Sequence, residues 1–162
     1  MRRATALYVA GLGLFIVSFI WSWAALPPVV ASHFDSNGNA NGWMDHNSFL
    51  VFVAGMGLLA LGVVPGLGAL AARHPGRYIS VPNRRYWLRP ENQVRFRSMF
   101  TALTMGIGAA VALLIGAANL ATIYANTRQP ANMVPPGGFV VGICVAVAVG
   151  LVLLIRRFRR SE

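Results

Sequence analysis

The stretch Ser98–Tyr124, which reads SMFTALTMGIGAAVALLIGAANLATIY, contains no charged side chain. A helix that rises about 1.5 Å per residue needs roughly 20 apolar residues to cross a hydrocarbon core of about 30 Å, and this stretch is long enough. Comparable apolar runs lie at 5–24, 49–71 and 137–155. The four runs predict an all-α membrane protein with four transmembrane helices, arranged as an up-and-down bundle in a single domain, 1–162.

The composition places the whole chain in the same class. Of its 162 residues, 56% are hydrophobic and 11% are charged, an apolar share that a soluble domain could not bury. The formal net charge of +10 would favour nucleic acid binding in a soluble protein. Here the arginines cluster at the ends of apolar runs, so we expect membrane lipids with anionic headgroups as partners and no nucleic acid.

The positions of the arginines predict the orientation of the chain. Every arginine except Arg128 precedes the first run, lies between the second and third runs, or follows the fourth. Because positively charged loops remain in the cytoplasm, both termini and the loop 72–97 are expected inside, with the loop 25–48 outside. Arg2 and Arg3 also resemble the start of a secretory signal. The run that follows exceeds the roughly 7–15 apolar residues of a signal, so we expect a retained helix.

Polar groups inside the predicted spans are few. Asn119 is the one amide deep within a span, and acidic, histidine and arginine side chains are confined to the span ends. Proton relays and ion pathways need such groups within the membrane, so a proton-coupled transporter is disfavoured. We expect Asn119 to form a hydrogen bond between helices rather than a substrate contact.

Small residues recur at four-residue spacing, which brings them to one face of a helix. Gly138, Gly142 and Gly150 share a face of the fourth run, and Gly62 and Gly66 have the same spacing in the second. Such faces allow two membrane helices to approach closely. These glycines are therefore predicted to pack helices within the bundle, with homodimerisation as the alternative.

The external loop 25–48 is rich in residues that favour turns. Asp35 begins a run of alternating oxygen ligands, but the glycine and glutamate of an EF-hand loop are missing, so calcium binding is not expected. His33, Asp35, Asp45 and His46 would bind a transition metal only if the turn folded back on itself. The chain also has no motif that pairs a nucleophile with a base. We therefore expect no enzymatic activity, no bound metal and no cofactor.

The internal loop 72–97 mixes arginines with aromatic residues. Aromatic rings with polar edges favour the headgroup zone, and guanidinium groups in that zone reach phosphates. The loop is therefore predicted to be an interfacial connector, with a dedicated docking site as the alternative. The candidate lipid-interface residues are Arg84, Arg85, Tyr86, Trp87 and Arg89.

Two motifs, one in each loop, resemble a known family. The external motif comprises Leu26-Pro27-Pro28, His33-Phe34, Gly38 and Gly42-Trp43, and the internal one is VPNRRYWLRPE at 81–91. Together they resemble a small bacterial membrane-domain family of unknown function, typified by the N-terminal domain of SdpI-like immunity proteins. The resemblance implies a multi-pass protein of the bacterial cytoplasmic membrane.

The resemblance also marks the external loop as a candidate recognition surface. The candidate partner-binding residues are His33, Phe34, Gly38, Gly42 and Trp43. The alternative is that His33 and Trp43 fasten the loop as a lid over the bundle and bind nothing.

The predicted function is a non-enzymatic interaction, immunity or sensing component whose external loop contacts a protein partner. A homo-oligomer is the other form of association that we expect. One alternative is a small transport or channel accessory subunit. Another is a membrane assembly factor that binds a metal through His33 and His46.

Overall fold

The computed structural model describes residues 2–74 and 83–128, together with isolated positions at 131, 145, 148, 149, 152 and 156. The described part is mostly helical. Apart from those isolated positions, the predicted span 137–155 lies outside the described residues, and so do Gly138, Gly142 and Gly150.

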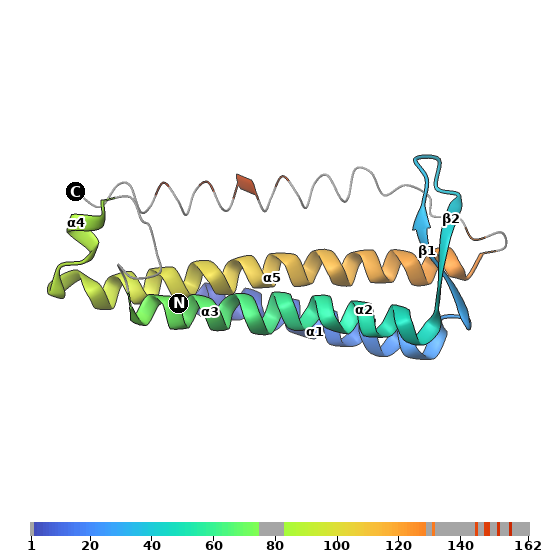
Figure 1. Cartoon of the computed structure of the whole chain (residues 1–162), viewed down its shortest axis with the longest axis horizontal. Coiled ribbons are helices and arrows are strands. Elements are labelled where there is room, and N and C mark those ends of the chain that lie inside the picture. The colour runs from blue at the N-terminus through green and yellow to red at the C-terminus, as the bar shows by residue number, and fades with distance from the viewer. Residues whose placement is uncertain are drawn as a thin grey trace.

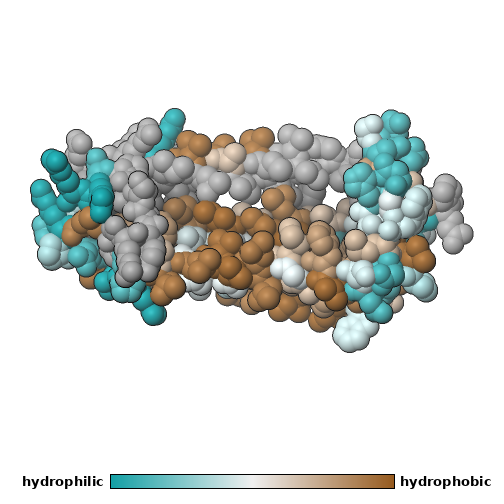
Figure 2. All heavy atoms as spheres, viewed as in Figure 1, coloured by the Kyte–Doolittle hydropathy of each residue, from teal (hydrophilic) through white to brown (hydrophobic). Residues whose placement is uncertain are grey.

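Three helical segments are long and apolar enough to cross a membrane, namely Ala4–Ala25, His46–Arg73 and Pro90–Asn126. They coincide with the first three predicted runs and extend each of them, so these runs are helical as predicted. In Figure 1 they lie side by side, with α1 (Arg2–Ala25) and the second segment both packed against α5 (Gln93–Asn126). Figure 2 shows an apolar band along the helices and polar residues at both ends, as expected of a membrane protein.

The second segment is continuous but changes its winding. It comprises α2 (His46–Leu58), a π-helical turn η1 (Leu59–Val63) and α3 (Val64–Arg73). Pro65 lies just after the π turn, and a proline has no N–H to give to the carbonyl four residues earlier, which here is that of Leu61. The hydroxyl of Tyr8 in α1 donates to this carbonyl. The break in the helix is therefore satisfied from a neighbouring helix, as the membrane interior requires.

Glycines at the helix crossings allow backbones to meet. A Cβ atom added at Gly108 of α5 would lie 2.4 Å from the carbonyl oxygen of Ala60, and one added at Gly11 of α1 would lie 3.0 Å from that of Ala109. Both contacts bring a Cα of one helix close to a carbonyl of another, which is the usual result of small residues at membrane helix crossings.

The described helices do not pack through Gly62 and Gly66. Among the described residues, an added Cβ at Gly66 would meet nothing within 4 Å, and one at Gly62 would meet only Leu58 of its own segment. The close packing lies instead at Gly57 and Gly68, which face Phe15 and Thr104. The four-residue spacing identified a helix face, but the π turn and the true crossing points place other glycines at the contacts.

A β-hairpin joins the first two spans. Its strands are β1 (Val29–Phe34) and β2 (Ala40–Asp45), and they pair antiparallel with an irregularity between Ala31 and Phe34. The sequence predicted turns for the whole loop, which holds for the stretch between the strands but misses the strands themselves. The reason is that the loop's glycine, asparagine and aspartate residues mask the short alternation of buried and exposed positions that marks a strand.

The opposite end of the bundle carries α4 (Arg84–Trp87) and a short 3-10 turn η2 (Pro90–Asn92) that leads into α5. Trp87 and Phe96 are both fully buried, with ring centroids 6.0 Å apart. The assignment of Trp87 to the lipid interface is therefore wrong, because its indole forms the centre of a small aromatic core. We call this end, with its exposed arginines, the arginine end, and the other the hairpin end.

Candidate functional site at the hairpin end

The turn of the hairpin is built on Asp35. Its carboxylate Oδ1 accepts hydrogen bonds from the backbone N–H groups of Asn37 and Asn39, each at 2.9 Å, and its own N–H donates to the Asn39 carbonyl at 2.9 Å. Gly38 has a φ of 86°, a conformation that glycine adopts at little cost. The N–H of Asn39, together with that of Asn37, holds the pKa of the Asp35 carboxyl below its ordinary 3.8. Asp35 is thus a turn former.

His33 and Gly42 face each other across the strands. A Cβ added at Gly42 would lie 3.0 Å from the Cβ of His33, so the glycine lets the strands approach at this irregular position. The imidazole Nδ1 of His33 lies 2.5 Å from the Asn41 side-chain oxygen, to which it donates. Phe34 is half-buried and pairs with Ala40. These contacts give His33, Phe34 and Gly42 structural roles in the hairpin.

The end of the hairpin is fixed to the start of α2. Asp45 caps this helix, since its side chain accepts from the N–H of Ser48 at 3.0 Å. Bonds from Ser48 hold the pKa of the Asp45 carboxyl below its ordinary 3.8. The N–H of His46 donates to the Pro28 carbonyl at 2.9 Å, and its imidazole Nδ1 lies 3.3 Å from the Pro27 carbonyl oxygen.

Asn126, in the last turn of α5, fastens the hairpin to the bundle. Its side-chain oxygen accepts from the N–H of Ala31 at 2.9 Å, and its Nδ2 donates to the Ala31 carbonyl at 3.0 Å. The amide therefore pairs with both backbone groups of one strand residue, as a neighbouring strand would. Its Nδ2 also donates to the Thr122 carbonyl at 2.9 Å, which holds the side chain in place.

An apolar core lies beneath the hairpin. Val30 is fully buried, and Met44, its partner on β2, packs against the same core. The other buried members come from α1's end, α2 and α5: Leu26, Phe49, Val53 and Ile123. One face of the hairpin is therefore committed to the fold, and only the other face is available to a partner.

Trp43 occupies that available face. It lies in the middle of β2, and 60% of its side chain is exposed. Opposite it is Ala31, which is buried. Val29, on the same face, is 62% exposed. Of the five residues predicted to bind a partner, Trp43 is the one whose side chain has no role in holding the hairpin together.

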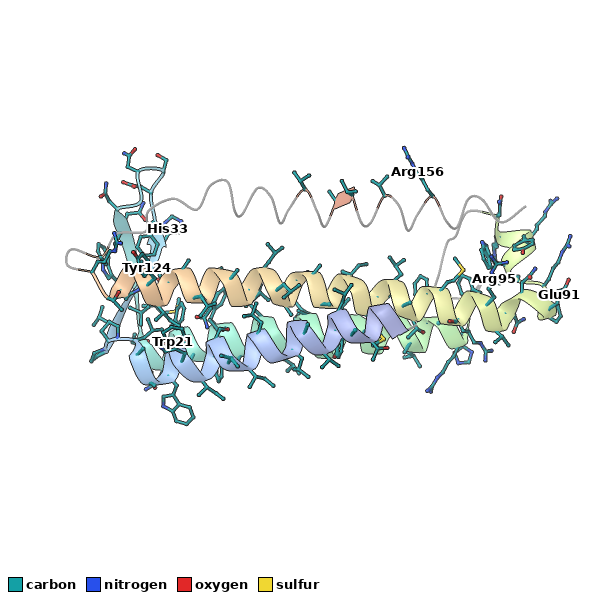
Figure 3. All side chains as sticks on the ribbon, turned by 180° about the vertical axis from the view of Figure 1, so that it is seen from behind. Trp21, His33, Glu91, Arg95, Tyr124 and Arg156 are labelled. Atoms are coloured by element: carbon teal, nitrogen blue, oxygen red, sulfur yellow. The ribbon has the colours of Figure 1, made fainter. Side chains whose placement is uncertain are left out.

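Other aromatic residues surround the hairpin end. Trp21 and Trp23 of α1 are 54% and 70% exposed, and Tyr124 of α5 is 54% exposed. In Figure 3, Trp21 points away from the helices, His33 lies on the hairpin and Tyr124 lies close to it. Tryptophan and tyrosine at one level of a helical bundle are typical of a membrane–water interface. The aromatic side chains at this end are therefore arranged as they would be if the hairpin stood at the membrane surface.

The metal-binding interpretation receives no geometric support from the described residues. They contain no group of three or more histidine, cysteine, aspartate or glutamate side chains that could hold an ion. Asp35 lies at the turn and Asp45 at the opposite end of the strands, while His33 and His46 bond to Asn41 and Pro27.

Asn119 lies in a buried polar cluster between α1 and α5. Its side-chain oxygen is 2.8 Å from the hydroxyl of Ser22, which also lies 3.0 Å from the Ser18 carbonyl. A hydroxyl has one hydrogen, so it donates to only one of these oxygens at a time. The Nδ2 of Asn119 is buried and, within the described chain, has no hydrogen-bond partner. Asn119 therefore links two helices.

The sequence interpretation missed Asn126 and Tyr8, which both join distant segments through side-chain hydrogen bonds. Each stands near a helix end, where a polar or amphipathic side chain is ordinary, and each bonds to a backbone group. The only available signal for Tyr8 was Pro65, because a proline within a membrane helix implies a donor elsewhere.

At the arginine end, Arg84, Arg85 and Arg89 are exposed and Tyr86 is half-buried. The guanidinium of Arg95 lies 5.9 Å from the centre of the buried Trp87 ring. Contact of these guanidinium groups with headgroup phosphates stays a prediction.

Residues 10–58 match a family defined by a domain of unknown function (DUF1648). The match covers most of α1, the whole hairpin and α2. It confirms the expected kind of family, a small membrane domain without an assigned role, while the link to SdpI-like proteins stays a prediction. No curated protein and no solved structure matches the chain significantly.

Proposed function

We propose that this chain, whose residues 10–58 form a domain of unknown function, is a non-enzymatic multi-pass protein of the bacterial cytoplasmic membrane. In this proposal the hairpin lies on the extracytoplasmic side and contacts a protein partner, and the protein acts in interaction, immunity or sensing. The charge distribution supports the orientation. In the described chain, the hairpin end carries Arg128 alone, whereas the arginine end carries Arg73, Arg84, Arg85, Arg89, Arg95 and Arg97.

The exposure of Trp43 on a rigid hairpin carries the proposal. A large aromatic side chain in the centre of a strand normally packs against a neighbour, and this one is 60% exposed. The hairpin beneath it is held by the two bonds between Asn126 and Ala31 and by the buried Val30. An aromatic side chain has only two rotatable bonds, so on a backbone that is already held it loses little conformational entropy on binding, which is why such residues dominate protein interfaces.

The roles of the other polar residues support a binding rather than a chemical function. Asp35 forms the turn, Asp45 caps α2, and His33 and His46 each have a bonding partner within the hairpin or its junction. These side chains are explained by the local fold, so they provide no argument for a catalytic group or a metal ligand.

The test is purification of the tagged protein from native membranes in mild detergent, with the mass and metal content of the intact complex measured. Wild-type protein should carry a stoichiometric second protein, and Trp43→Ala should lose it. Trp21→Ala, which removes an equally exposed indole from α1, is the matched control and should retain it. His33→Ala should weaken recovery indirectly, by loosening the hairpin.

Three outcomes would overturn the proposal. A metal-free homo-oligomer with no second protein would favour a transport or channel subunit, and solute flux in vesicles would then be measured. Stoichiometric metal would favour the assembly factor. Recovery of the same partner with Trp43→Ala would show that the hairpin is only a lid over the bundle.

A further inference from the structure

We propose that the free edge of β2 binds an extended, positively charged peptide segment as a third strand, centred on Trp43. This inference rests on the proposed function and specifies how the partner is held. It follows from the way in which Asn126 contacts the opposite strand.

The contact with Asn126 fixes the hydrogen-bonding direction of Ala31. Both the N–H and the C=O of Ala31 bond to the Asn126 amide, so neither points toward β2. In an antiparallel pair, residues opposite each other either exchange both bonds or turn both groups outward. Trp43 is opposite Ala31 and therefore also turns its N–H and C=O outward, toward the far edge of β2.

A second hydrogen bond, at the other end of the strands, independently supports this direction for the Trp43 groups. His46 N–H donates to the Pro28 carbonyl at 2.9 Å, so these two residues form a bonded pair. Bonded and non-bonded pairs alternate along the ladder, which makes Val29 and Asp45 a non-bonded pair. The N–H of Asp45 consequently faces the same edge as the two groups of Trp43.

This edge is open in the described part of the chain. Outside the hairpin ladder, no described residue bonds to the N–H or C=O of Trp43. The side chains of Asn41, Trp43 and Asp45 are exposed, and the strand irregularity lies nearer the turn. By contrast, the edge of β1 is covered by Asn126. Native proteins usually cover or interrupt an exposed strand edge, and an open one is a template for an added strand.

The negative charge near this edge favours a positively charged peptide. Asp35 and Asp45 are the acidic residues of the hairpin, which contains no arginine or lysine. Hydrogen bonds to both carboxylates favour their charged forms. The indole face of Trp43 can receive a guanidinium group or an aliphatic side chain. A second copy of the chain would present the same two acidic residues, so a basic peptide fits this edge better.

The probe is a synthetic octapeptide that alternates arginine and valine, added to the protein in nanodiscs of zwitterionic lipid. Two matched peptides are compared with it: one with glutamate in place of arginine, and one with alternate backbone amides N-methylated on the pairing side. Empty nanodiscs measure binding to lipid. Affinity is followed with labelled peptide, and the exchange rate of the Trp43 amide hydrogen by NMR.

We expect the arginine peptide to bind and to slow exchange of the Trp43 amide. The glutamate peptide should not bind, and N-methylation should weaken binding by at least about tenfold, the effect of losing one or more hydrogen bonds. Trp43→Pro and Trp43→Ala both remove the indole, but only the proline variant removes the N–H. Binding should therefore be weaker in Trp43→Pro than in Trp43→Ala.

Equal binding of the N-methylated peptide, or an unchanged Trp43 amide exchange rate, would overturn the strand mode. The peptide comparison uses wild-type protein, so it is decisive even if the proline variant does not fold. Failure here is also distinct from failure of the proposed function. A native partner that is lost with Trp43→Ala but leaves the Trp43 amide unprotected would keep the function and remove the strand mode.

Discussion

The hydroxyl of Tyr8 donates a hydrogen bond to the carbonyl of Leu61, the group that Pro65 leaves without its ordinary helical donor. The two residues belong to different spans, so a local irregularity in one helix fixes its register against another. The neighbouring carbonyl of Ala60 faces Gly108, whose Cα approaches it closely. The π turn is thus contacted from two sides, by a hydrogen bond from α1 and by the close approach of α5.

This arrangement predicts that Tyr8→Phe destabilises the bundle. The change keeps the ring and removes only the hydroxyl that donates to the Leu61 carbonyl in an apolar environment. The expected loss is about 1–3 kcal/mol in the free energy of unfolding. Reversible unfolding in detergent would measure it. Tyr124→Phe, which removes an exposed hydroxyl, is the control, and an equal effect of the two changes would contradict the assignment.

Replacement of Asn126 should release the hairpin. Asn126→Ala removes the two bonds to Ala31, at about 1 kcal/mol each, and the amide of Ala31 should then exchange with solvent much faster. Asn47→Ala, in an exposed position on α2, should leave that exchange rate unchanged. Slow exchange at Ala31 in the Asn126→Ala variant would show that the apolar core alone holds the hairpin.

Two glycines of α5 provide a matched pair for the helix crossing. Gly108→Ala would place a Cβ 2.4 Å from the backbone oxygen of Ala60, which cannot move without shifting a helix, whereas Gly106→Ala would meet nothing described within 4 Å. We expect Gly108→Ala to destabilise the bundle by about 1–3 kcal/mol and Gly106→Ala to be neutral or stabilising. The unfolding temperatures of both variants in detergent would measure this difference in stability. Similar unfolding temperatures would contradict the crossing.

The hairpin should loosen in acid. The pKa of both Asp35 and Asp45 is lowered in the folded protein, so their contribution to stability is complete above the ordinary value of 3.8 and is lost as the pH falls through the lowered pKa. Carboxyl NMR resonances should show both groups titrating below 3.8. The amide of Asn39, which bonds to Asp35, should lose protection over the same range, and Asp35→Asn should remove its share of the pH dependence. Titration of Asp35 at or above 3.8 would contradict this role.

The sequence predicted the helices well because their determinant is local. An uncharged run of sufficient length is visible without knowledge of its neighbours, and the described spans appear where these runs lie. The hairpin has a different origin. Its strand β1 is held by Asn126, 95 residues away, and such a contact has no local signature. The turn alone was predictable, through Asp35 and Gly38.

In the candidate site too, some features could be predicted from the sequence and others depend on contacts between distant residues. The family resemblance singled out His33, Gly42 and Trp43, but only packing distinguishes their roles. His33 and Gly42 are used within the hairpin, and Trp43 remains exposed. At the arginine end, aromatic composition suggested the interface for Trp87, whereas its position against Phe96 buries it. Exposure depends on neighbours that are distant in the sequence.

The most direct test of the central claim is photocrosslinking in intact cells with a benzophenone amino acid at position 43, compared with the same group at position 21. The account predicts that position 43 forms a crosslink to a single extracytoplasmic protein segment, that position 21 crosslinks lipid, and that Asn126→Ala abolishes the first product. Crosslinks from position 43 to lipid alone, or to a cytoplasmic protein, would contradict the claim that the hairpin presents Trp43 to a partner outside the membrane.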